Sequence, residues 1–205
     1  MKLINVFFKI FKNYNFYIFI IIFFEIYYYI KGYKGFKFNL SRNKTMADDI
    51  PCPYYFLFKI LRVLKKTNFK SFIDLGCGSG RIIDFINKNF SNKKLVGVEY
   101  FNKQFTYSKE IFKKSQNISI IQSDFTKLNL RRNIYDIYFL SAPFKNKKDF
   151  LKFMKKISKI KKIQKKIIIT INYEKKLLQK VGKIRFIDTF YLSEDKGYSI
   201  CLIKS

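Results

Sequence analysis

The feature that most constrains the fold is an alternation of short apolar runs with amphipathic segments from residue 48 onward. The predicted strands and helices, in chain order, are 53–65 (helix), 71–74, 81–87 (helix), 95–98, 102–114 (helix), 118–122, 134–140, 150–160 (helix), 166–171 and 174–181 (helix). This alternation is typical of an α/β fold, in which a mostly parallel sheet carries helices on both faces. Two final apolar runs, 184–192 and 198–203, flank a turn-like stretch and predict an antiparallel hairpin at the sheet edge.

A second feature is the hydrophobic run FYIFIIIFFEIYYYI at residues 16–30, in which only Glu25 is neither apolar nor aromatic. A spanning helix needs about 20 apolar residues, so this run would span only with Lys9 and Lys12 in the interface. We therefore expect a helical membrane anchor that either spans the bilayer or lies on it. A secretory signal peptide and a buried core helix are the alternatives, but no small-residue cleavage site follows.

The division of the chain follows from these two patterns. Residues 1–47 are expected to form the hydrophobic membrane segment with a basic linker, and residues 48–205 the folded domain. Three lysines precede the run and five basic residues follow it within the linker, which predicts that the C-terminal part lies on the cytoplasmic side.

Net charge is the third constraint, because 42 Lys and Arg residues against 14 Asp and Glu residues give a formal charge of +28. Richness in Lys, Ile, Phe, Asn and Tyr is also what an A/T-rich genome would produce, so the charge has a compositional explanation as well as a functional one. The functional alternatives are binding to RNA or to an anionic membrane, and residues 145–180, with fourteen lysines, are the densest region. No aromatic-interleaved RNA motif accompanies them, so lipid contact is the simpler expectation.

Absent residue types exclude whole classes of chemistry. The chain has no His, which excludes Ser-His-Asp triads, Cys-His dyads and HExxH zinc sites. Its three cysteines, Cys52, Cys77 and Cys201, form no CxxC pair, so neither a metal site nor a disulfide framework is expected. Scattered free cysteines are typical of a reducing compartment.

The most informative motif is DLGCGSG at residues 74–80, between a predicted strand and a predicted helix. Its glycines allow a sharp turn, and the following helix N-terminus offers free N–H groups to an anion. A dinucleotide fingerprint would need a sixth-position glycine, where this chain has Arg81, and a P-loop would need Gly-Lys-Ser/Thr. Asp74 would repel a pyrophosphate but attract an ammonium group, so the loop suits a ligand that carries both ammonium and carboxylate.

Acidic residues also end the next two predicted strands. Glu99 follows the second strand, where a carboxylate can accept hydrogen bonds from both ribose hydroxyls. Asp124 follows the third strand and could accept from an exocyclic amino group, with Phe125 beside the ring. Together with the glycine loop, these residues describe a nucleoside that carries an amino acid, which is S-adenosylmethionine.

From residue 50 to the end, the sequence resembles class I S-adenosylmethionine-dependent methyltransferases (EC 2.1.1). The resemblance rests on four motifs: DLGCGSG (74–80), VGVEY (96–100), IQSDF (121–125) and YDIYFLSAPF (135–144). It implies a Rossmann-like sheet and S-adenosylmethionine as the cofactor. The implied roles are the methionine part for Asp74, Gly76, Cys77, Gly78 and Gly80, the ribose for Glu99, and the adenine for Asp124 and Phe125.

A narrower likeness concerns the acceptor. Pro51-Cys52-Pro53 before a helix, with Arg81 directly after the last glycine, is similar to small membrane-anchored lysine methyltransferases that modify an ATP synthase subunit. The loop Ser141-Ala142-Pro143-Phe144 is similar to the Asn/Asp-Pro-Pro-aromatic loop of amino-group methyltransferases, with Ser and Ala in the first two places. It makes Ser141, Pro143 and Phe144 the candidate catalytic residues and a protein lysine the expected acceptor. An RNA base, a small molecule and an inactive scaffold protein remain alternatives.

Overall fold

The computed structural model describes residues 17–33, 51–130, 134–144, 146–160, 166–182, 184–194 and 196–203. Residues 1–16 and most of the predicted linker at 31–47 lie outside the described residues. The elements, in chain order, are α2 (Tyr17–Ile30), α3 (Tyr54–Leu64), β1 (Ser71–Leu75), α4 (Arg81–Asn89), β2 (Lys94–Glu99), α5 (Asn102–Phe112), β3 (Ile118–Gln122), η1 (Phe125–Lys127), β4 (Ile137–Ser141), α6 (Lys147–Ser158), β5 (Lys166–Ile171), α7 (Lys175–Gln179), β6 (Ile184–Ser193) and β7 (Lys196–Ile203).

One seven-stranded sheet organises the described chain, with strand order β3-β2-β1-β4-β5-β7-β6. Neighbours from β3 to β5 run parallel, whereas β7 is antiparallel to both β5 and β6. The predicted α/β architecture and the C-terminal hairpin are therefore confirmed. Helix α6 begins three residues before its predicted start, because Asn146 caps it by accepting a hydrogen bond from Lys148 N at 2.8 Å.

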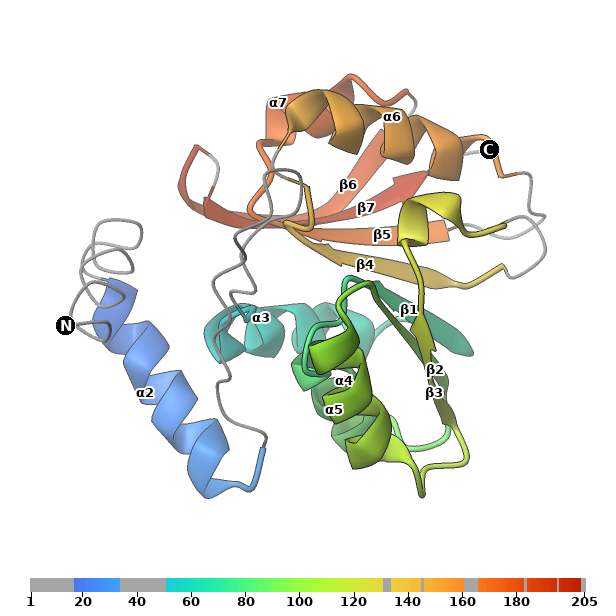
Figure 1. Cartoon of the computed structure of the whole chain (residues 1–205). Helices are drawn as coiled ribbons and strands as arrows, with labels where there is room; N and C mark the ends of the chain where they lie inside the picture. Colours follow the sequence, from blue (N-terminus) through green and yellow to red (C-terminus); the bar gives the residue numbers. More distant parts are fainter. Residues whose placement is uncertain are drawn as a thin grey trace, which may run out of the picture.

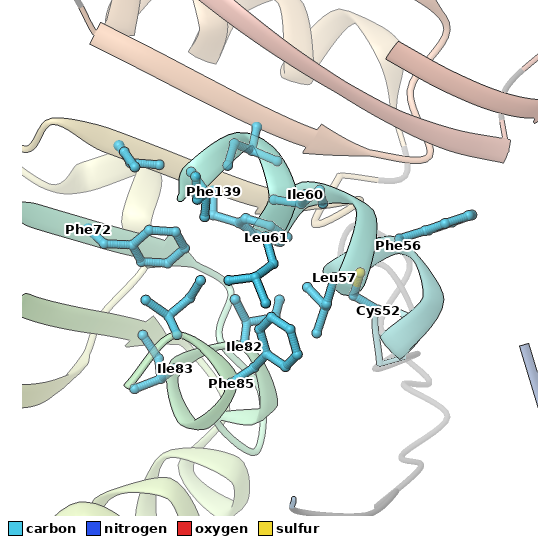
Figure 2. Packing of buried hydrophobic residues seen from close by; sticks show 14 of the residues in the cluster. Cys52, Phe56, Leu57, Ile60, Leu61, Phe72, Ile82, Ile83, Phe85 and Phe139 are labelled. Carbon is cyan, nitrogen blue, oxygen red and sulfur yellow. The ribbon is translucent and has the colours of Figure 1, made fainter. Parts of the chain in front are cut away.

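The sheet is covered on both faces (Figure 1). Helices α3, α4 and α5 bury apolar side chains against one face, and α6 and α7 bury theirs against the other. Figure 2 shows the first of these layers, where Leu61 of α3 and Ile83 and Phe85 of α4 pack together near Phe72 of β1. The alternation of side chains along each strand produces these two separate cores, as the period of two requires.

Strand order reverses between β1 and β4, which lie side by side at the centre of the sheet. The loops after these two strands leave in opposite directions and open a crevice at the carboxyl ends of the strands. Ligands bind in this position in open α/β sheets.

The hydrophobic segment forms α2, a helix of 14 residues that packs against α3. Ile18, Ile21 and Tyr28 are its buried residues. Tyr28 stacks on Tyr54 of α3 with ring centroids 4.8 Å apart and meets Phe85 of α4 edge-on at 5.4 Å. None of the helices in the described residues is long and apolar enough to cross a membrane.

Candidate functional site

The glycine loop lies between β1 and α4 and closes back onto β2. The N–H groups of Gly76 and Cys77 both donate to the carbonyl of Val98, at 2.9 and 3.0 Å. Gly80 adopts φ 84°, and an added Cβ would lie 2.6 Å from Phe112 Cε2. Both the left-handed backbone and the lack of space require glycine at this position. The first turn of α4 is thereby brought directly behind the loop.

Glu99, the last residue of β2, accepts hydrogen bonds from the glycine loop and from the segment after β2. Its Oε2 accepts from Gly78 N and its Oε1 from Phe101 N, each at 2.8 Å. Burial raises the pKa of the Glu99 carboxyl, and these backbone N–H groups oppose that shift by favouring the charged form. Each oxygen keeps a lone pair for a further donor.

Asp74 is fully buried at the end of β1. Within the described part of the chain, neither of its carboxylate oxygens has a hydrogen-bond partner. Burial, and secondarily repulsion from Glu99, raises the pKa of the Asp74 carboxyl well above its ordinary value of 3.8. Such an orphaned buried carboxyl is costly for the fold and suits a cationic ligand group.

A cavity of about 760 Å³, including the space open to solvent, lies over the loop. Its lining residues come from the chain before α3, from the last residues of β2 and β4, from the segments that follow β1, β2 and β4, and from the starts of α4, α5 and η1. They are 51–52, 76–79, 81–82, 99–101, 104, 125 and 141–143. The predicted residues Gly76, Cys77, Gly78, Glu99 and Phe125 are thus brought together. Asp74, Gly80 and Asp124 are not among the lining residues.

Phe125 begins η1 after β3, and Asp124 is the residue directly before it. Asp124 Oδ1 accepts from Thr126 N at 2.9 Å and from Thr126 Oγ1 at 2.6 Å, so it caps this short helix. Phe125 is buried and lies edge-on to Phe144 with centroids 5.3 Å apart. A contact between Asp124 and adenine stays a prediction.

The loop after β4 forms the opposite wall. Ser141, Ala142 and Pro143 line the cavity. Pro143 lies close to the glycine loop, because a Cβ added to Gly76 would be only 3.3 Å from the Cβ of Pro143. Ala142 has φ 44°, an uncommon backbone conformation for a residue other than glycine. Phe144 lies behind this wall, where its N–H donates to the hydroxyl of Tyr173 at 3.1 Å.

The cavity also takes in Pro51, Cys52, Arg81, Phe101 and Gln104, which the motif spacing does not predict. Phe101 and Gln104 follow Glu99 within one helical turn. Arg81 follows the last glycine of the loop directly, and this position next to the motif is the one feature of the sequence that could have placed it at the site.

Comparison with known proteins identifies the family. Residues 65–186 match the family described as "Methyltransferase domain", which is more than half of the chain. A search of curated proteins found no match.

Solved structures show the same fold. A SAM-dependent methyltransferase from Aquifex aeolicus aligns with TM-score 0.55 and 19% identity, covering 70% of this chain and 88% of that one. An RNA methyltransferase from Salinibacter ruber, in complex with S-adenosyl-L-homocysteine, aligns with TM-score 0.59 and 14% identity, covering 76% and 95%. A putative caffeoyl-CoA O-methyltransferase from Staphylococcus aureus aligns with TM-score 0.55 and 16% identity, covering 76% and 85%.

The matched domain, the sheet with its reversal between β1 and β4, and the glycine loop beside Glu99 agree with one another. The chain belongs to the class I S-adenosylmethionine-dependent methyltransferases, and S-adenosylmethionine is its cofactor.

Proposed function

We propose that this methyltransferase modifies an amino nitrogen, with the side chain of a protein lysine as the favoured acceptor. The observation that carries the proposal is the wall formed by Ser141 and Pro143, which faces the glycine loop across one cavity. The resemblance of this loop to those of amino-group methyltransferases supports an amine.

The charges around the cavity support this placement of the cofactor. Asp74 lies below the cavity lining, directly before the glycine loop, and its lack of a partner in the described chain supports a role as the counter-charge of the ammonium group. The N-terminus of α4 behind Gly76, Cys77, Gly78 and Gly80 would favour the carboxylate.

The nucleoside part would lie toward β2 and β3. Glu99 would accept from two ribose hydroxyls with the lone pairs that its backbone partners leave. Phe125 offers an apolar surface to the adenine, and Asp124 would accept from its amino group through Oδ2, because Oδ1 is engaged by Thr126.

When bound, S-adenosylmethionine supplies an activated methyl group on a sulfonium leaving group. The protein then has mainly to position the acceptor and exclude water. Ser141 Oγ would accept a hydrogen bond from the amine, aiming the nitrogen lone pair into the cavity. Pro143, with Phe144 behind it, would keep water out. The lysine must attack as the neutral amine, because only that form has a free lone pair, and partial desolvation favours it.

RNA and small molecules are the competing acceptors. The lysine-rich region 145–180 and the similarity to an RNA methyltransferase structure favour RNA as the second candidate. Transfer of a labelled methyl group into a whole lysate, followed by protease or ribonuclease treatment, separates the cases. Label removed with the protein fraction and found on lysine supports the proposal; label on RNA or on small molecules contradicts it. An inactive scaffold would bind S-adenosylmethionine weakly or not at all by calorimetry.

We also propose that the enzyme works at a membrane, to which residues 16–30 attach it with the domain on the cytoplasmic side. Support comes from the outer surface of α2, where several large apolar side chains are exposed, among them Phe19 (61%), Phe23 (63%) and Ile30 (77%). Aromatic residues beside lysine, here Lys31 over Tyr27, suit the headgroup region of an anionic bilayer. The helix would lie along the interface, because its inner side is occupied by α3 and α4.

A further inference from the structure

Glu25, the one acidic residue of the hydrophobic run, points inward from α2 rather than toward a bilayer. Its side chain is 12% exposed. Its Oε1 accepts from Tyr54 N at 2.9 Å, and Arg81 Nη1 reaches both of its oxygens, at 3.1 and 3.0 Å. One carboxylate therefore joins α2 to the first residue of α3 and the first residue of α4.

Arg81 carries this connection to the cofactor cavity. It follows Gly80, lines the cavity and is 3% exposed. Its Nη1 also donates to the carbonyl of Cys52 at 3.3 Å, and its guanidinium carbon lies 4.4 Å from the Tyr54 ring centroid. Since Pro51 and Cys52 line the same cavity, one side of the cofactor site is held together through Arg81.

The energetics make this connection depend on Glu25. Burial raises the pKa of the Glu25 carboxyl, and the charge of Arg81 opposes that shift, so the two groups support each other. Helix α3 has no side-chain cap at Pro53, and Glu25 serves the Tyr54 N–H in its place. Without the Glu25 carboxylate, the buried guanidinium would lose the ion pair that joins it to α2, and the residues that this ion pair holds together could shift.

We propose that Glu25 is a positioning residue of the methyltransferase: from α2 it fixes Arg81 and the Pro51–Cys52 segment in the arrangement that cofactor binding requires. The proposal rests on the assignment of this cavity to S-adenosylmethionine. It makes α2 a part of the cofactor site, whatever else its outer surface contacts.

The test compares Glu25→Gln with Glu110→Gln in the full chain. Both variants remove one negative charge, but Glu110 forms an exposed ion pair with Lys113 away from the cavity. Calorimetry with S-adenosylmethionine, well below the melting temperature, should give a Kd about tenfold higher for Glu25→Gln and an unchanged Kd for Glu110→Gln. A purely structural role would lower the Tm of Glu25→Gln and leave its Kd at the wild-type value, and that result overturns the proposal.

A second variant covers the case in which Glu25→Gln does not fold. Glu25→Asp keeps the charge and shortens its reach by one methylene, so its Kd should lie between those of the wild type and Glu25→Gln. If Glu25→Gln cannot be measured, the positioning role is refuted when Glu25→Asp binds S-adenosylmethionine as tightly as the wild type does. Failure of the wild type itself to bind would instead contradict the cofactor assignment, so the two failures are distinguishable.

Discussion

Replacing Asp74 with asparagine should make the protein more stable and its cofactor binding weaker. The carboxyl is fully buried, and no partner for it lies among the described residues. Asparagine has nearly the same shape and removes only the charge. The unliganded enzyme should therefore be relieved of a cost, whereas the ammonium group of the cofactor should lose its counter-charge.

The size of the gain has a ceiling that follows from the pKa shift. At neutral pH the folded protein either keeps the charge of Asp74 buried or protonates this carboxyl. Protonating at pH 7 a carboxyl with an ordinary pKa of 3.8 costs about 4 kcal/mol, so the buried charge cannot cost the fold more than this. The amide of the new asparagine would also be buried without partners, and this reduces the stabilisation by roughly 1–3 kcal/mol. We expect a net stabilisation of about 1–3 kcal/mol, or about 2–10 °C in Tm for a chain of this size.

The sign of the pH dependence is a second signature. Because the folded pKa of Asp74 is raised, its contribution to stability is complete below the unfolded value of 3.8 and is lost as pH rises toward the folded pKa. The Tm difference between Asp74→Asn and the wild type should therefore be small near pH 4 and grow toward neutral pH. Thermal unfolding from pH 4 to 8 measures it, and calorimetry should show Kd for S-adenosylmethionine raised at least tenfold. A variant that is less stable than the wild type at neutral pH, or that binds the cofactor equally well, would refute the reasoning.

Three further perturbations test the site and the surface. Glu99→Gln should weaken S-adenosylmethionine binding by about 1.5–3 kcal/mol, since it removes a charged acceptor from both the loop and the ribose; calorimetry showing an unchanged Kd would exclude the ribose contact. Gly80→Ala should lower the free energy of unfolding by about 2–4 kcal/mol, because the new Cβ meets Phe112 in a left-handed backbone; denaturant titration would show no loss if the loop can rearrange. Phe19→Ser with Phe23→Ser should reduce flotation with phosphatidylserine vesicles, while an exposed Ile121→Ser control should not; equal flotation of all variants, or none by the wild type, argues against α2 as the lipid contact.

The sheet could be predicted from the sequence because its signals are local. Runs such as 167–171 are short, β-branched and fully buried, and they stand between segments of helical period. The parallel arrangement then follows from the alternation itself. The start of α6 cannot be predicted from the spacing of apolar residues, because it depends on one capping hydrogen bond of Asn146.

The site could be predicted in part. Gly76, Gly78 and Glu99 come together because strand ends of a parallel sheet meet at one edge. Arg81 and Cys52 could not be assigned from spacing, since Arg81 meets Cys52 across 29 residues of sequence and Glu25 across 56 residues. The sequence alone predicts a membrane anchor for the hydrophobic run. The pattern of apolar residues does not show that Glu25 pairs with a buried arginine of the domain.

The seating of α2 on α3 and α4 has a practical consequence for biochemical work. Hydrophobic N-terminal segments are commonly trimmed to obtain soluble protein, and residue 50 would be the obvious cut. Here that cut would uncover the rings of Tyr54 and Phe85 and remove the Glu25 carboxylate from Arg81. Poor turnover of such a shortened enzyme would reflect the missing helix rather than its catalytic residues, so solubility is better sought by changing the outer surface of α2 in the intact chain.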